Sequence, residues 1–245
     1  LTWEAVRRVP AGGVWTLTGD AQAAAALGQQ ATNLEPVERP VILTGAIIDL
    51  PSLIREAQND ADAAVAFDLI IGRNALTHLE DKAQAVQTLK SLLKPTGRLV
   101  LAEVVPNYTQ RLHKLVDLST LQPSLIDRIV TAEEAIYQNP NDPMINWNET
   151  SLTAIFDQAG FGHTDIRLEP AVAQVRVGAQ QLERWFAETS AGHRPTFAQH
   201  LLTPATGTGL TSTELKTLKD SFAKQLTGQV VSWQSTIAYV LVRRA

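Results

Sequence analysis

The chain has 245 residues, of which 44% are hydrophobic, a formal net charge of −4 and no cysteine. This length and apolar content are enough to bury one large core, with or without an appended subdomain. The lack of cysteine excludes disulfides, thiolate metal sites and a cysteine nucleophile, and it favours a cytoplasmic protein. The negative net charge gives no indication of nucleic-acid binding. The apolar stretches are shorter than the roughly 20 residues of a membrane helix. The five histidines show no ligand spacing, so no metal site is predicted.

Helices and strands alternate in the first part of the chain. A helix is expected over residues 1–9, a strand over 14–18 and an alanine-rich helix after Asp20. A further strand is expected over 41–44, followed by a short helix that begins near Asp49. Alternation of this kind is typical of an α/β fold.

The stretch from Phe67 to Pro106 predicts a strand, a helix and a second strand. The strands are expected over 68–71 and 98–105, and Asp81 is placed to cap the helix between them. Two buried strands joined through a helix form a right-handed crossover, so the sheet is predicted to be parallel. Ligands bind at the carboxyl ends of such strands, which directs attention to residues 72–78 and 103–107.

Residues 107–148 are predicted to be mostly helical, with helices over 111–118 and 124–137. Near the end of the chain, Thr211 and Glu214 have the spacing of a capping box. Residues 230–243 are expected to form a closing strand.

Two of these stretches resemble a known family. FDLIIGRNALTHLED followed by LLKPTGRLVLAE resembles the fourth strand, fourth helix and fifth strand of class I S-adenosylmethionine-dependent methyltransferases, and SLTAIFDQAGFGHTDIRLEP resembles their last helix and sixth strand. The resemblance implies an α/β, three-layer Rossmann-like sheet that is mostly parallel, with an antiparallel last strand and a helical insertion after the fifth family strand. We expect one methyltransferase-like domain over residues 1–245. In it, 1–106 and 148–245 form the core with C-terminal helices, and 107–147 form the insertion.

The family's first strand and its glycine-rich loop have no counterpart, because G-x-G-x-G does not occur in the sequence. The opening helix and strand resemble the family's first helix and second strand. We therefore expect the native protein to continue upstream of Leu1; the alternative is a family member that has lost this element. In the family the strands have the order 3-2-1-4-5-7-6, with the first strand at the centre of the sheet. Without this strand, residues 14–18 and 68–71 are expected to pair directly, or a strand from another chain is expected to fill the gap.

The resemblance also assigns cofactor-binding candidates. Asp20 stands where the family has an acidic residue that binds the cofactor ribose, although it could equally cap the following helix. Gly45 ends the next strand. Ala46 replaces the aspartate that contacts adenine in the family, with Asp49 three residues further on.

Gly72, Arg73 and Asn74 are expected to border the methyl group and the substrate, and Asn74 could instead stabilise its loop. His78 is the candidate general base, with a surface or capping role as the alternative. Glu103 follows the next parallel strand and is a substrate candidate. Asp20, Gly45, Asn74 and Glu103 are predicted to meet at one crevice.

Tyr137, Asn146 and Trp147, in the helical insertion, are candidates for the substrate pocket. Trp147 could instead belong to the core.

Three further runs, LTWEAVRRVP, AEEAIYQNPNDPMINWNE and VVSWQSTIAYVLVRR, resemble the C-terminal domain that some bacteria fuse behind a replication-associated recombination ATPase of the AAA+ class. This resemblance implies an upstream ATPase as partner within the same chain and a role in DNA replication and recombination. A homo-oligomer is a further possible assembly. Two functions follow: a methyltransferase-like domain that uses S-adenosylmethionine but binds it weakly or not at all as this fragment, or a non-catalytic interaction or oligomerisation module beside the ATPase.

Overall fold

The computed structural model describes residues 1–58, 65–145, 147–189, 195–205 and 207–244. The chain forms two compact units. The first unit comprises Leu1–Glu103, Ser151–Arg167 and Tyr239–Ala245, and the second comprises Val104–Thr150 and Leu168–Ala238. The segment expected as an insertion, 107–147, thus lies in a unit that also contains much of the C-terminal region.

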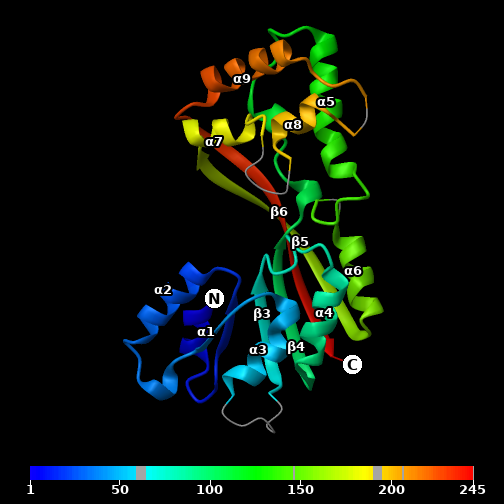
Figure 1. The fold of residues 1–245 in the computed structure, drawn as a ribbon. Helices are drawn as coiled ribbons and strands as arrows, with labels where there is room; N and C mark the ends of the chain where they lie inside the picture. The colour runs from blue at the N-terminus through cyan, green and yellow to red at the C-terminus, as the bar shows by residue number, and fades with distance from the viewer. Residues whose placement is uncertain (59–64, 146, 190–194, 206, 245) are drawn as a thin grey trace. The chain divides into compact units, whose positions relative to one another are not determined.

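The first unit begins with the expected alternation of helices and strands (Figure 1). Its elements are α1 (Thr2–Arg8), β1 (Trp15–Thr18), α2 (Ala21–Ala31), η1 (Pro36–Glu38), β2 (Val41–Thr44), η2 (Ile47–Asp49) and α3 (Leu50–Ala57). Strands β1 and β2 pair in parallel, with Trp15 opposite Val41 and Thr18 opposite Thr44. They form a two-stranded sheet of their own.

The predicted strand–helix–strand unit is confirmed. It consists of β3 (Phe67–Arg73), α4 (Lys82–Ser91) and β4 (Leu93–Val104), and β3 pairs with β4 in parallel. Asp81 caps α4 as predicted, because its side chain accepts a hydrogen bond of 2.8 Å from the Gln84 amide. Strand β4 starts five residues earlier than expected. The pairing jumps from Phe67 with Leu93 to Leu69 with Arg98, so the expected turn residues bulge out of the ladder.

A four-stranded sheet has the order β3-β4-β6-β5, as the family resemblance implied for its second half. Helix α6 (Glu149–Gln158) leads into β5 (Phe161–Arg176), and β6 (Val230–Arg244) is inserted between β4 and β5. The Arg244 side chain donates to the carbonyl of Leu93, whereas the Val105 amide donates to Thr236 at the other end of β4. The last strand is therefore antiparallel to β4, as predicted.

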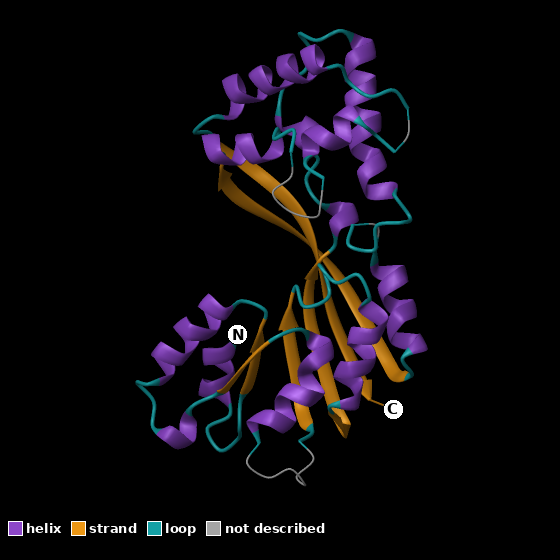
Figure 2. Ribbon diagram, in the orientation of Figure 1, coloured by secondary structure: helices purple, strands orange, loops and turns teal. Residues whose placement is uncertain are grey.

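The expectation that residues 14–18 and 68–71 pair directly is wrong for the described residues. Strand β1 pairs with β2 alone, and β3 pairs with β4 alone (Figure 2). The prediction assumed that an unpaired edge would be buried. However, Leu69 and Ile71 of β3 are 52% and 39% exposed, so water can bind the free backbone groups at this edge.

The second unit is mainly helical. Besides two short 3₁₀ segments, η3 (Pro106–Tyr108) and η4 (Leu112–Leu115), it contains α5 (Pro123–Gln138), α7 (Ala179–Trp185), α8 (Phe197–Leu202) and α9 (Ser212–Leu226). Ile129, Leu201, Leu218 and Phe222 belong to its fully buried core. The predicted capping box is confirmed at the start of α9, where Thr211 and Glu214 bond each other's backbone amides.

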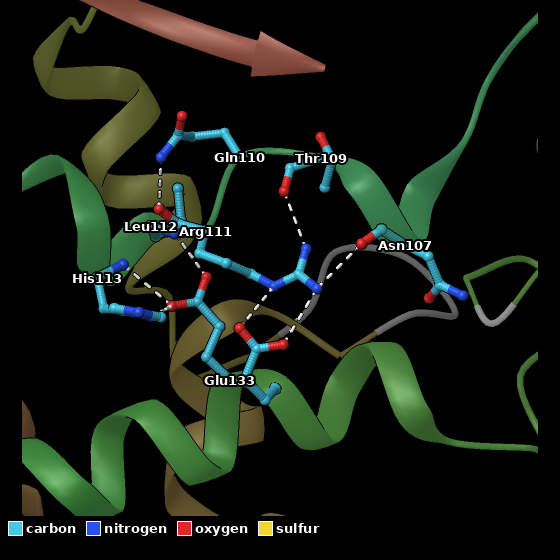
Figure 3. A network of polar contacts seen from close by, with 8 residues as sticks. Asn107, Thr109, Gln110, Arg111, Leu112, His113 and Glu133 are labelled. Atoms are coloured by element: carbon cyan, nitrogen blue, oxygen red, sulfur yellow. Dashed lines mark hydrogen bonds and ion pairs between the residues drawn. The ribbon is translucent and has the colours of Figure 1, made fainter. Parts of the chain in front are cut away.

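The helix expected over 111–118 is wrong, since only Leu112–Leu115 is helical and is of the 3₁₀ type. Here backbone groups bond to side chains instead of to the next turn (Figure 3). The amides of Leu112 and His113 donate to the Glu133 carboxylate, at 2.5 and 3.0 Å. The guanidinium of Arg111 donates to the backbone carbonyls of Asn107 and Thr109. These tertiary bonds replace the helical ones.

Candidate functional site

A cavity of about 1220 Å³ lies within the first unit. Residues of β1 and β3 line it on two sides, and α1, β2, α3 and α4 contribute further side chains. Part of the wall is apolar and includes Leu17, Leu43 and Ile70. Other parts of the wall are the segments that follow β2 and β3, which is the position that parallel sheets use for ligands.

All but one of the predicted cofactor residues line this cavity: Gly45, Ala46, Gly72, Arg73 and Asn74. Asp20 is absent from the wall, although its neighbour Gly19 lines it. Glu103 and His78 are also outside the wall. The predicted convergence of four residues is thus seen for Gly45 and Asn74 only.

Asp20 acts as a helix cap. Its carboxylate accepts a hydrogen bond of 2.9 Å from the Gln22 amide, at the first turn of α2. The side chain is exposed, so this bond leaves other acceptor sites on the carboxylate accessible.

At the end of β2, Asp49 turns back toward the strand. Its carboxylate accepts a bond of 3.4 Å from the amide of Ala46. A carboxylate therefore lies beside the position where the family has its own acidic residue, although it comes from three residues further along the chain. Asp49 is not part of the cavity wall.

The end of β3 is tightly constrained. A Cβ on Gly72 would lie 2.8 Å from a methyl carbon of Leu101 and 3.0 Å from the Cβ of Ala75, so glycine permits the close approach of β3, β4 and the following loop. Asn74 has a φ of 50°, in the left-handed region that asparagine tolerates. Its amide donates to the carbonyl of Ala102 at 2.9 Å. Asn74 thus stabilises its loop while it lines the cavity.

Glu103 is completely buried, with 0% of its surface exposed. Its carboxylate bonds to the loop that follows β3, where it accepts from the amides of Ala75, Leu76 and Thr77 and from the Thr77 hydroxyl. Burial raises the pKa of Glu103, and these hydrogen bonds act in the opposite direction. A side chain held in this way contacts the loop rather than a ligand in the cavity.

His78 is exposed and lies in the same loop region. Because it is outside the cavity wall, the structure gives no contact that would make it a base toward a ligand in the cavity.

Tyr137 and Trp147 belong to the second unit, and Asn146 lies outside the described residues. The guanidinium of Arg111 lies 3.6 Å from the centre of the Tyr137 ring. Burial raises the pKa of Tyr137 to about 12, with a further contribution from Glu133. Trp147 is buried, in agreement with its alternative role in the core.

Among the residues that the structure describes, no group of three or more acidic or histidine side chains is placed to hold a metal ion. Likewise, no helix in the described ranges is long and apolar enough to cross a membrane.

Helix α1 is a part of the site that sequence reasoning missed. Leu1, Ala5 and Val9 line the cavity, together with Thr2. Their spacing of four residues places them on one face of the helix, which was the available signal. The hydroxyl of Thr2 lies 2.9 Å from that of Thr16 and joins this helical segment to β1.

Known proteins are similar in sequence pattern and in fold. A family model described as a methyltransferase domain matches residues 18–164, which is more than half of the chain. Among solved structures, a proposed methyltransferase from Bacillus halodurans C-125 is similar with a TM-score of 0.50 and 12% identity, over 98% of this chain and 87% of that one. The YcgJ protein of Bacillus subtilis is similar with a TM-score of 0.50 and 14% identity, over 95% and 82%. No curated protein matches. At such identities the structural likeness concerns the fold alone.

Proposed function

The chain belongs to the methyltransferase domain family, and we propose that its cavity in the first unit is a binding site for S-adenosylmethionine, the cofactor expected of this family. One observation carries the proposal: Gly45, Ala46, Gly72, Arg73 and Asn74, which come from the ends of β2 and β3, line the same cavity. Its volume of about 1220 Å³ is ample for a ligand of this size.

The residues present fit such a ligand in chemical terms. The apolar side chains of Leu17, Leu43 and Ile70 can exclude water from the reacting atoms, and the backbone carbonyls after β2 and β3 offer acceptors. Arg73 adds a positive charge at the wall, which suits the carboxylate of this ligand and not its sulfonium. When bound, S-adenosylmethionine supplies a methyl group on a sulfonium, and its transfer needs chiefly an aligned acceptor in a dry site. The chain's contribution would be this alignment.

We further propose that residues 1–245 alone bind the cofactor weakly. The sequence contains no G-x-G-x-G loop, and Ala46 has no carboxylate for the adenine amine. Fewer polar contacts mean a smaller binding free energy, so we expect a dissociation constant of about 100 μM or weaker.

The test is a titration of the chain with S-adenosylmethionine. Binding is measured by the chemical-shift changes of the protein in NMR spectra and by calorimetry. Ala46→Trp places a large ring at the cavity wall and should abolish the shifts, whereas Gln29→Trp, on the exposed side of α2, should leave them unchanged. Shifts that persist in Ala46→Trp would contradict binding in this cavity. A dissociation constant of the unmodified chain far below about 100 μM would contradict weak binding.

A second candidate is a non-catalytic interaction or oligomerisation module beside an AAA+ ATPase of the same polypeptide, in DNA replication and recombination. The observation that favours it is the apolar edge of β3, where Leu69 and Ile71 are large, exposed side chains. The resemblance of residues 1–10, 132–149 and 230–244 to the domain fused to such ATPases supports the same candidate.

This candidate predicts self-association or binding to the ATPase through β3. Sedimentation of the chain, alone and with a purified ATPase region of this class, measures both. Leu69→Lys should weaken the association, and Val37→Lys, at another exposed apolar residue, is the matched control. Equal effects of the two substitutions would argue against a role for this edge.

A further inference from the structure

The carboxylate of Glu103 is bonded to one loop by four hydrogen bonds. Its Oε1 accepts from the Ala75 amide at 2.8 Å. Its Oε2 accepts from the amides of Leu76 and Thr77 at 3.0 and 2.8 Å, and from the Thr77 hydroxyl at 2.8 Å. Both oxygens are therefore used as acceptors.

This loop forms part of the cavity wall, whereas Glu103 does not. Asn74, Ala75 and Leu79 line the cavity. Leu76 and Thr77, between them, are 0% and 5% exposed, so their amides need partners inside the protein. Glu103 supplies these partners from β4, 26 to 28 residues further along the chain.

A carboxylate is suited to this position in a way that an amide is not. Four donors converge on two oxygens, and only an ionised carboxylate presents acceptors at both. A glutamine would keep one acceptor oxygen and would point an NH₂ group at a backbone N–H. Burial disfavours the ionised carboxylate, and the hydrogen bonds from the loop offset part of this cost.

We propose that Glu103 is a positioning residue for the cavity: it fixes the backbone of Ala75, Leu76 and Thr77 and thereby holds Asn74 and Ala75 in the wall. The bonds to the loop stand on their own, while the consequence for cofactor affinity rests on the proposed function.

The first test measures the loop itself by amide hydrogen exchange, with NMR detection at about pH 7. In Glu103→Gln, we expect the protection of the Leu76 and Thr77 amides to fall by at least about tenfold, and that of Leu99 and Val100 in β4 to fall much less. Glu103→Asp retains a carboxylate and should restore part of the protection. Glu80→Gln, an exposed neighbour of the same loop, is the matched control and should change nothing.

Thr77→Val provides a milder variant, since it removes the hydroxyl bond to Glu103, leaves the three amide bonds and keeps the side-chain volume. We expect it to fold and to lower protection at Thr77 by a few fold. The proposal is overturned if Thr77→Val leaves the loop amides unchanged. It is also overturned if Glu103→Gln lowers the protection of the loop and of β4 equally, because this would indicate a general loss of stability.

Binding of S-adenosylhomocysteine, measured by NMR shifts in the same variants, tests the consequence for the cavity. We expect weaker binding in Glu103→Gln and partial recovery in Glu103→Asp. If the unmodified chain does not bind this ligand, the proposed function fails, whereas the exchange rates still decide whether Glu103 fixes the loop. Unchanged affinity in a Glu103→Gln chain with a loosened loop would overturn the positioning role.

Discussion

At the scale of single residues, two buried or half-buried glutamates have opposite electrostatic environments. Burial dominates at Glu103 and raises its pKa. At Glu214, the hydrogen bond from Arg128 is the largest influence, followed by that of Thr211, and the pKa is lowered to about 2. Their ionisation should therefore affect folding stability with opposite signs.

For Glu214, the folded-state pKa lies below the ordinary value of 4.5. Its contribution to stability is thus present above pH 4.5 and is lost as the pH falls toward about 2. We expect Glu214→Gln to be less stable than the unmodified chain near neutral pH, with the difference vanishing in acid. Urea unfolding followed by circular dichroism across this range measures it. Glu183→Gln, which breaks the exposed pair with Lys219, is the control and should change the stability little at neutral pH.

For Glu103, the folded-state pKa lies above 4.5, so the folded chain takes up a proton more readily than the unfolded chain. The stability that this provides is present below pH 4.5 and is lost as the pH rises through the raised pKa. The unfolding free energy of the unmodified chain, relative to Glu103→Gln, should decrease as the pH rises from about 4 to about 7. A relative stability that increases over the same range would contradict this assignment.

At the scale of elements, the first unit depends on the close contact of β3 with the start of β4. The loop between α4 and the main part of β4 bulges at residues 94–97, which lets the ladder resume at Leu69 and Arg98. Gly97 is placed where the two backbones approach. A Cβ there would lie 2.9 Å from the carbonyl oxygens of both Lys94 and Phe67.

Gly97→Ala should consequently destabilise the chain. The obstructing atoms are backbone carbonyl oxygens, and forced overpacking of this kind costs about 1–3 kcal/mol. Gly28→Ala is the matched control, because nothing lies within 4 Å of the added methyl in the interior of α2. It should leave stability unchanged or raise it by up to about 1 kcal/mol. Chemical denaturation of both variants gives the comparison, and equal midpoints would contradict the packing argument.

At the scale of the whole molecule, each unit contains an apolar cluster of its own. The second unit is built around a cluster that includes the aromatic rings of Phe186, Phe197 and Phe222, with the Phe186 and Phe222 centres 5.1 Å apart. The first unit contains a smaller cluster of Leu43, Ile54 and Leu92 next to the cavity. The cavity is lined by residues of the first unit.

Phe222→Ala should accordingly act mainly on the second unit. Removing this fully buried ring leaves a cavity and costs about 3–5 kcal/mol. In native-state hydrogen exchange, we expect the amides of α5 and α9 to lose more protection than those of α4. Equal losses in both units would show that they unfold as one.

Most of the local elements and their order could be predicted from the sequence alone. The alternation of apolar runs with caps such as Asp81 and Thr211 predicted α4, α9 and the parallel pair β3 and β4, because these features depend on neighbours within one helical turn or on a single crossover. Family resemblance added the order of the last four strands and the residues at the ends of β2 and β3 that line the cavity.

Only the tertiary structure decided what depends on contacts distant in sequence. It replaced the helix expected at 111–118 by a loop bonded to Glu133, and it left β1 and β3 unpaired with each other across a cavity. It also made Glu103 a buried partner of Ala75, Leu76 and Thr77, where its position at a strand end had suggested a substrate contact. No local pattern encodes such bonds, since a carboxylate finds its donors through the packing of the whole unit, and burial sets its charge only after that packing exists.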